Sequence, residues 1–276
     1  MTKPFLSVEN LVVDYHVKGG TFRAVDDVSF SVEKGKTVAV VGESGCGKST
    51  IAKALMRLVK PASGRIELDG TDLAQLSEAQ LRPLRSKFQM VFQDPYGSLD
   101  PHLTAQEIVA EPLKLQGVRS RAERERAAAK LIDQVGLPVR SLDKHPAEFS
   151  GGQRQRIGIA RALASKPELL VCDEATSALD VSVQAQVLRL LKSIQDETGI
   201  TYVFISHNLG VVQEISDTVM VMRSGKLVEA GTTASVLTTP KEDYTRKLRR
   251  AALDPSTMRG LKPRHLVSSL ALKTSA

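Results

Sequence analysis

The chain has 276 residues, of which 42% are hydrophobic and 25% are charged, and it carries a formal net charge of +7. This composition describes an ordinary soluble globular protein, long enough for one α/β domain with an inserted subdomain or a tail. No apolar run approaches the ~20 residues that a membrane-spanning helix needs, and no basic-then-apolar pattern marks a signal peptide. We therefore expect a cytoplasmic chain.

The positive charge is concentrated toward the C-terminal end. Residues 241–276 hold nine Lys and Arg against three Asp and Glu, so six of the seven net charges lie there. The rest of the chain is nearly neutral and lacks the basic stripe of a nucleic-acid-binding face. We therefore expect no nucleic-acid partner, and we interpret the tail as solvated or as contacting an anionic membrane surface.

Two antiparallel strands are predicted near the N-terminus, where apolar and polar residues alternate over 6–17 and 24–32. Residues 17–21 between them are predicted to be a loop. A third strand, the apolar stretch 37–41, follows, and its β-branched residues indicate burial on both faces.

A predicted phosphate-binding loop follows this third strand and leads into a predicted helix at 51–56, which is the context that the motif requires. Its glycines let backbone N–H groups close around phosphates, whose charge then meets the positive end of the helix. The predicted nucleotide-binding residues of the loop are Gly42, Glu43, Ser44, Gly45, Cys46, Gly47, Lys48, Ser49 and Thr50.

Individual side chains have predicted roles in nucleotide binding. Lys48 adds a positive charge toward the β and γ phosphates, and Ser49 offers the hydroxyl that Mg²⁺ prefers. Tyr15 is the ring that we expect to stack on adenine, with Phe22 as the second candidate and core packing as the alternative role for Tyr15. The loop alone does not distinguish kinases, GTPases, helicases and transport ATPases.

Gln93 lies where the predicted strand 88–92 meets a loop. Its amide oxygen is predicted to complete a Mg²⁺ shell while its backbone acts as a hinge. The local sequence alone favours a solvated loop glutamine.

Between 103 and 163 the pattern changes to helix, with helical spacing over 104–115 and 120–135. The segment ends in a helix start in which a serine N-cap and two glycines leave the first N–H groups exposed, as in an anion site. Two phosphate-binding helix starts in one chain suggest that they face each other across two molecules. The residues of this second start are Ser150, Gly151, Gly152 and Gln153.

An acidic pair follows the predicted buried strand 169–172, a costly place for two charges unless a metal or a reaction uses them. Asp173 is predicted to hold Mg²⁺, and Glu174 to act as the general base that polarises the attacking water. Residues 177–180 turn the chain into a helix whose apolar stripe we interpret as core.

His207 follows the next predicted strand, 202–205. Since ligands of α/β sheets bind at strand ends, we expect His207 to contact the γ-phosphate. A lone histidine is otherwise more often structural. A closing hairpin is predicted at 218–222 and 226–229.

Residues 5–250 resemble the ATP-binding cassette ATPases, because their motifs occur in that family's order. Residues 42–50 resemble Walker A, Gln93 the Q-loop, 150–153 the signature, 169–174 Walker B, 177–180 with Asp180 the D-loop, and His207 the switch histidine. The resemblance implies an α/β P-loop NTPase with a RecA-like core, an N-terminal antiparallel β-subdomain and an inserted helical subdomain.

The same resemblance sets the expected domain bounds. The cassette would span 1–239, with its core at 1–93 and 166–239 and its helical subdomain at 94–165. Residues 240–276 would form the basic tail.

Phe149 before the signature, the residues after Gln93 and the closing Asp243-Tyr244-Thr245 resemble the oligopeptide/dipeptide importer subfamily. This implies an ATP-hydrolysing motor subunit at the cytoplasmic face of the cell membrane. Its implied partners are a second cassette in a head-to-tail dimer, two transmembrane permease subunits and, indirectly, an external solute-binding protein.

Other functions stay open at this point: a soluble cassette ATPase acting on DNA or ribosomes, or an export or lipoprotein-release motor.

Cofactors are expected to be ATP and Mg²⁺. Cys46 and Cys172, the two cysteines, support neither a disulfide nor a metal site and are interpreted as small buried side chains. Some subfamily members carry cysteines near the C-terminus that are linked to an iron–sulfur cluster. None follows Cys172, so we expect no cluster.

Overall fold

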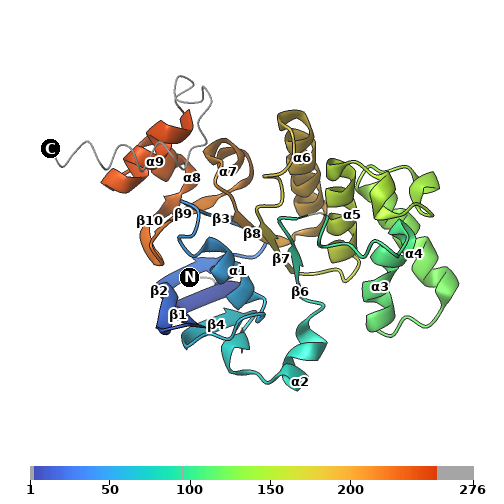
Figure 1. The fold of residues 1–276 in the computed structure, drawn as a ribbon, viewed down its shortest axis with the longest axis horizontal. Helices are drawn as coiled ribbons and strands as arrows, with labels where there is room; N and C mark the ends of the chain where they lie inside the picture. Colours follow the sequence, from blue (N-terminus) through green and yellow to red (C-terminus); the bar gives the residue numbers. More distant parts are fainter. Residues whose placement is uncertain (1–2, 95, 254–276) are drawn as a thin grey trace. The chain divides into compact units, whose positions relative to one another are not determined.

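A computed structural model describes residues 3–94 and 96–253 (Figure 1). The described residues fall into two compact units. The first contains residues 3–75 and 204–253, and the second contains residues 76–203 apart from residue 95. Within these ranges no helix combines the length and apolar character needed to cross a bilayer. The basic tail predicted at 240–276 is described only as far as residue 253, so most of it lies outside the described residues.

The first unit contains a four-stranded antiparallel sheet in the order β2-β1-β4-β5. Its strands are β1 (Leu6–Val17), β2 (Gly20–Val32), β4 (Ser63–Leu68) and β5 (Thr71–Asp72). The predicted N-terminal strand pair is confirmed, but β2 begins four residues earlier than predicted. Gly19, at φ 102°, allows a two-residue turn, so most of the predicted loop is paired strand.

The first unit also contains a sheet segment in which β3 pairs in parallel with β9, and β9 forms the predicted hairpin with β10. These strands are β3 (Thr37–Gly42), β9 (Thr218–Arg223) and β10 (Lys226–Thr232). The helices of this unit are α1 (Lys48–Leu55), α7 (Leu209–Ile215), α8 (Thr233–Thr238) and α9 (Asp243–Leu253), with a short 3-10 turn, η1 (Leu73–Gln75). All six residues of β3 are buried, as its apolar sequence predicts.

The second unit contains the parallel pair β6 (Phe88–Val91) and β7 (Leu169–Asp173). Between them in sequence come α3 (Ala105–Leu115), α4 (Arg121–Gln134) and α5 (Gly151–Leu163), which pack on one another (Figure 1). The remaining elements are α2 (Glu78–Leu81), the 3-10 turns η2 (Arg82–Leu84), η3 (Val139–Ser141) and η4 (Pro146–Glu148), α6 (Val181–Thr198) and β8 (Thr201–Ile205), whose last two residues belong to the first unit. The predicted boundary between core and helical subdomain stays a prediction.

Helices of the second unit begin where short polar side chains can cap them. The side chains of Thr104, Ser120, Ser150 and Asp180 each accept a hydrogen bond from the backbone N–H three residues on. The predicted starts of these helices are therefore correct to within one residue. The apolar stripe of α6 is core, but Leu188 is buried in it while Leu190 is only half-buried.

Candidate functional site

The loop between β3 and α1 needs its glycines for two different reasons. Gly42, Gly45 and Gly47 all have positive φ values, of 150°, 82° and 106°. A Cβ at Gly42 would lie 2.3 Å from the Met222 carbonyl oxygen, whereas a Cβ at Gly45 would meet nothing within 4 Å. Gly42 therefore permits a close approach of β9, and Gly45 serves only the backbone conformation.

Lys48 is the first residue of α1, directly after this loop, and is only 4% exposed. Its ammonium donates hydrogen bonds to the carbonyl oxygens of Gly42, at 2.9 Å, and Glu43, at 2.8 Å. Helix α1 begins at Lys48 without a side-chain cap. A buried cation beside an uncapped helix start is a site that fits an anionic phosphate.

Cys46 and Cys172 are both buried and free, as predicted. Burial raises the pKa of the Cys46 thiol, and burial raises the pKa of the Cys172 thiol to about 12. Both thiols therefore stay protonated and act as small apolar side chains.

Glu174 follows the buried end of β7 in an unusual backbone conformation, with φ 46°. The backbone N–H and the hydroxyl of Ser177 both donate to its carbonyl oxygen, at 3.0 and 2.9 Å. This turn presents the half-buried carboxylate of Glu174 just beyond the buried Asp173.

Gln93 and Glu174 meet in the second unit, 81 residues apart in sequence. The side-chain amide of Gln93 donates a 2.9 Å hydrogen bond to Oε2 of Glu174. The local sequence allowed a solvated glutamine at this position, and nothing in it pointed to this contact. Gln93 is thus placed to orient the carboxylate predicted to be the general base.

The predicted Mg²⁺ ligands, Ser49, Gln93 and Asp173, include a single carboxylate, and they stay a prediction. Among the described residues, no group of three or more His, Cys, Asp and Glu forms a metal-binding cluster. The three predicted ligands fit a hard cation that takes most of its oxygen ligands from a phosphate and from water, as Mg²⁺ does.

His207 lies in the first unit, between the end of β8 and α7, and is exposed. The N–H of Ser206 donates to the Val40 carbonyl oxygen of β3 at 3.2 Å, and the Asn208 side chain caps α7. His207 is therefore held beside the strand that leads into the phosphate loop.

Tyr15 and Phe22 form a cross-strand pair on β1 and β2. Tyr15 is half-buried, whereas Phe22 is 55% exposed. The two residues considered for adenine stacking are therefore neighbours on adjacent strands of the first unit. Tyr15 remains the predicted contact.

The segment 150–153 forms a helix start of the predicted kind. The backbone N–H of Ser150 donates to Oε1 of Gln153 at 2.9 Å, and the N–H of Gln153 donates to Oγ of Ser150 at 3.4 Å. Gly151 begins the helix α5, and both Ser150 and Gln153 are exposed.

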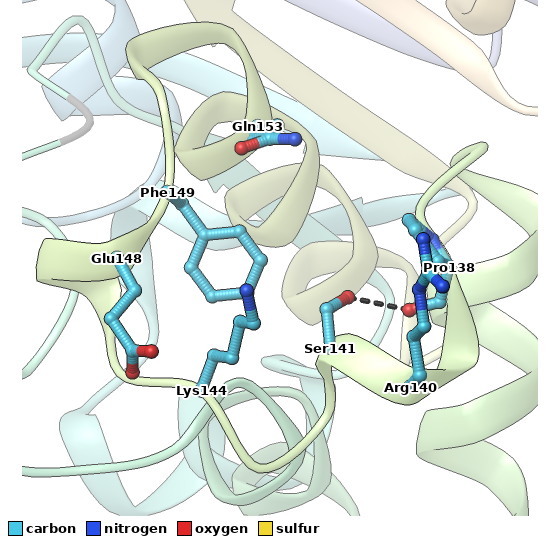
Figure 2. A pocket seen from close by; sticks show the side chains of 7 residues that line it. All are labelled: Pro138, Arg140, Ser141, Lys144, Glu148, Phe149 and Gln153. Atoms are coloured by element: carbon cyan, nitrogen blue, oxygen red, sulfur yellow. Dashed lines mark hydrogen bonds between the residues drawn. The ribbon is translucent and has the colours of Figure 1, made fainter.

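A pocket of about 370 Å³ lies beside this helix start (Figure 2). It is lined by Pro138, Arg140, Ser141, Lys144, Glu148, Phe149 and Gln153. Figure 2 shows the Ser141 hydroxyl donating to the Pro138 carbonyl, which closes one wall of the pocket. The Phe149 ring occupies another wall, so the residue preceding the signature segment is a packing residue of this pocket.

Asp180 has a structural role that its predicted D-loop position did not indicate. Its carboxylate accepts from the Ser182 hydroxyl at 2.7 Å and from the Val183 N–H at 2.9 Å, and these bonds hold the carboxyl pKa below its usual value. Asp180 thereby fixes the first turn of α6.

Gly152 makes a contact that sequence reasoning missed. A Cβ on Gly152 would lie 2.3 Å from Cγ1 of Val183 on α6. The signature segment and the first turn of α6 therefore pack at a distance that only glycine permits.

Gly152→Ala is expected to lower the free energy of unfolding by about 1–3 kcal/mol, because the added methyl overpacks the α5–α6 contact. Gly158→Ala is the matched control, since its Cβ would meet nothing within 4 Å on the same helix. The control should be neutral or stabilising by up to ~1 kcal/mol. Urea denaturation measures both, and the double variant Gly152→Ala with Val183→Ala should recover stability. Equal effects at Gly152 and Gly158 would contradict the contact.

Comparison with known proteins decides the family. The ABC transporter family matches residues 25–177, more than half of the chain. The chain belongs to the ABC transporter family. A probable peptide ABC transporter ATP-binding protein of Sinorhizobium fredii is 50% identical to this cassette over 266 residues, covering 94% of this chain and 75% of that protein.

Two further similarities bear on the cassette. A glutathione import ATP-binding protein of Pectobacterium atrosepticum is 46% identical over 263 residues, covering 92% of this chain and 42% of that protein. A solved ATP-binding cassette in dimeric, post-hydrolysis form with ADP and phosphate matches with a TM-score of 0.76 and 30% identity, covering 83% of this chain and 98% of that one. These similarities confirm the predicted α/β cassette fold, and the chain is an ATP-binding ATPase subunit of a transporter.

Proposed function

We propose that this cassette is the ATP-hydrolysing motor subunit of an importer for peptides or similar small solutes, bound to the cytoplasmic face of the cell membrane. The observation that carries the proposal is the 50% identity to a probable peptide transporter ATP-binding protein over 94% of the chain. Similarity to a glutathione import protein supports the same class of small solute.

In the proposed site, the loop 42–50 binds the phosphates through its backbone N–H groups, and the Lys48 ammonium neutralises their charge. Tyr15 stacks on the adenine. Ser49, Asp173 and Gln93 would hold Mg²⁺, which supplies further neutralisation of phosphate charge.

The reaction in this proposal is hydrolysis of ATP to ADP and phosphate. Glu174 orients the attacking water and accepts its proton, and Gln93 holds the Glu174 carboxylate through the 2.9 Å hydrogen bond. His207 contacts the γ-phosphate. Phosphoryl transfer needs mainly positioning and charge neutralisation, which these polar side chains provide.

The proposed active unit contains two cassettes in head-to-tail arrangement. In it, the residues 150–153 of one chain meet the ATP held by the loop of the other, and Asp180 lies at the contact between the chains. Similarity to a dimeric cassette structure supports the dimer in this proposal. Two permease subunits would be the membrane partners, with a solute-binding protein acting on them from outside.

The test is a pull-down of tagged Glu174→Gln protein with MgATP from its native cells in gentle detergent. Two co-purifying polytopic membrane proteins, with or without a second cassette ATPase, would support the importer proposal. The same pull-down with Lys48→Ala protein controls for contacts that need no nucleotide. Recovery of ribosomes or nucleic acid without membrane proteins would overturn the importer function and favour a soluble ATPase. Membrane partners that belong to an exporter would also overturn it.

A further inference from the structure

The C-terminal helix α9 places a tyrosine against the phosphate-binding loop. Tyr244, on the first turn of α9, is 8% exposed, and its ring belongs to a buried cluster with Ala39 and Val41 of β3. Its hydroxyl accepts a hydrogen bond from the backbone N–H of Glu43 at 3.4 Å. This contact joins residues 201 positions apart, both within the first unit.

Both backbone polar groups of Glu43, the N–H and the carbonyl oxygen, therefore have hydrogen-bond partners. Tyr244 binds the N–H of Glu43, while the ammonium of Lys48 donates to its carbonyl oxygen at 2.8 Å. Lys48 is the cation proposed to meet the phosphates of ATP, so its bonds to loop carbonyls must be shared or lost when nucleotide binds. The Glu43 N–H donates to the Tyr244 hydroxyl, so among the N–H groups of the loop this one would hold the loop while the others bind phosphate.

The start of helix α9 is held in place by contacts with strands β9 and β10. The Glu229 carboxylate of β10 accepts from the backbone N–H groups of Lys241, at 2.8 Å, and Glu242, at 3.2 Å, immediately before α9. The Arg223 guanidinium lies 5.0 Å from the centre of the Tyr244 ring. The helix start is thus tied to the β9–β10 hairpin.

The same hairpin reaches the phosphate loop at a second point. The N–H of Gly225, two residues after Arg223, donates to the Cys46 carbonyl oxygen at 3.0 Å. Burial raises the pKa of the Tyr244 phenol to about 12, so the hydroxyl stays neutral at physiological pH. The loop is therefore supported from outside by the hairpin and by α9 together.

We propose that Tyr244 is a positioning residue for nucleotide binding: its hydroxyl fixes the Glu43 N–H and so keeps the phosphate loop in its binding conformation when Lys48 turns to the phosphates. This assigns α9 a part in the nucleotide site. The inference rests on the proposed ATPase function of the loop.

The test compares Tyr244→Phe with the matched control Tyr202→Phe. Both remove one phenol hydroxyl from a buried ring, but the Tyr202 hydroxyl donates to the Leu191 carbonyl oxygen on α6 at 2.8 Å. Tyr244→Phe should weaken the affinity for MgATP and for MgADP by roughly 2- to 10-fold, the range expected for one hydrogen bond. Its KM should rise by a similar factor while kcat changes less than twofold.

Hydrogen exchange of the wild-type protein gives an independent readout. The Glu43 amide should exchange slowly both without nucleotide and with MgADP, and Tyr244→Phe should make it exchange faster in both states. Fast exchange of this amide in wild-type protein would overturn the inference. So would unchanged nucleotide affinity in Tyr244→Phe, or an equal loss of affinity in Tyr202→Phe.

The two proposals fail in distinguishable ways. Wild-type protein that binds no ATP would overturn the ATPase function and this inference together. Wild-type protein that binds ATP, alongside Tyr244→Phe with the same affinity and KM, overturns only the role of Tyr244.

Discussion

Glu174→Gln is expected to bind MgATP with nearly wild-type affinity and to lose at least ~100-fold in turnover, the range expected when a general base is removed. The amide has the size of the carboxylate but takes no proton from water. The phosphate loop and Lys48 lie in the first unit and are unchanged. The Ser177 bonds that shape the turn go to the backbone of Glu174, so they survive the substitution.

Steady-state phosphate release and equilibrium binding of MgATP measure the two effects separately. Glu197→Gln is the control, because it removes an exposed carboxylate in the last turn of α6 and should leave turnover unchanged. If two cassettes close on ATP as proposed, size-exclusion chromatography with MgATP should show a larger dimer fraction for Glu174→Gln than for wild type. Retained steady-state hydrolysis by Glu174→Gln would refute the role of Glu174 as base.

Lys48→Ala is expected to weaken binding of MgATP itself by at least ~10-fold, since a hydrogen bond to a charged group contributes about 1.5–3 kcal/mol. The substitution removes the cation that faces the phosphates. It also removes the ammonium that holds the carbonyl oxygens of Gly42 and Glu43. Both the charge and the shape of the loop are therefore lost, and hydrolysis falls with binding.

Calorimetric titration with MgATP and MgADP measures this loss. Lys53→Ala is the matched control, because Lys53 lies on the same helix but is exposed in its last turn. The control should bind nucleotide as wild type does. Lys48→Ala protein that binds MgATP normally while failing to hydrolyse it would show that Lys48 acts in the reaction step alone.

Local features of the sequence predicted much of the fold and of the site. The glycine spacing between an apolar strand and a helix predicted the phosphate loop, and the structure gives Gly42, Gly45 and Gly47 the positive φ values that it needs. Ser150 and the two glycines after it predicted a helix start, and the structure forms it with reciprocal hydrogen bonds between Ser150 and Gln153. These features involve residues at most a few positions apart, so backbone geometry and neighbouring side chains determine them.

The tertiary structure alone decided which distant residues support the site. It brought Gln93 to the Glu174 carboxylate, Val183 to the signature glycine Gly152, and Tyr244 to the N–H of Glu43. No local pattern predicts these contacts, because each depends on how strands and helices far apart in sequence pack beside one another. The sequence by itself thus determined the chemical groups of the site and their local conformation, whereas packing between distant elements determined which groups hold them in place.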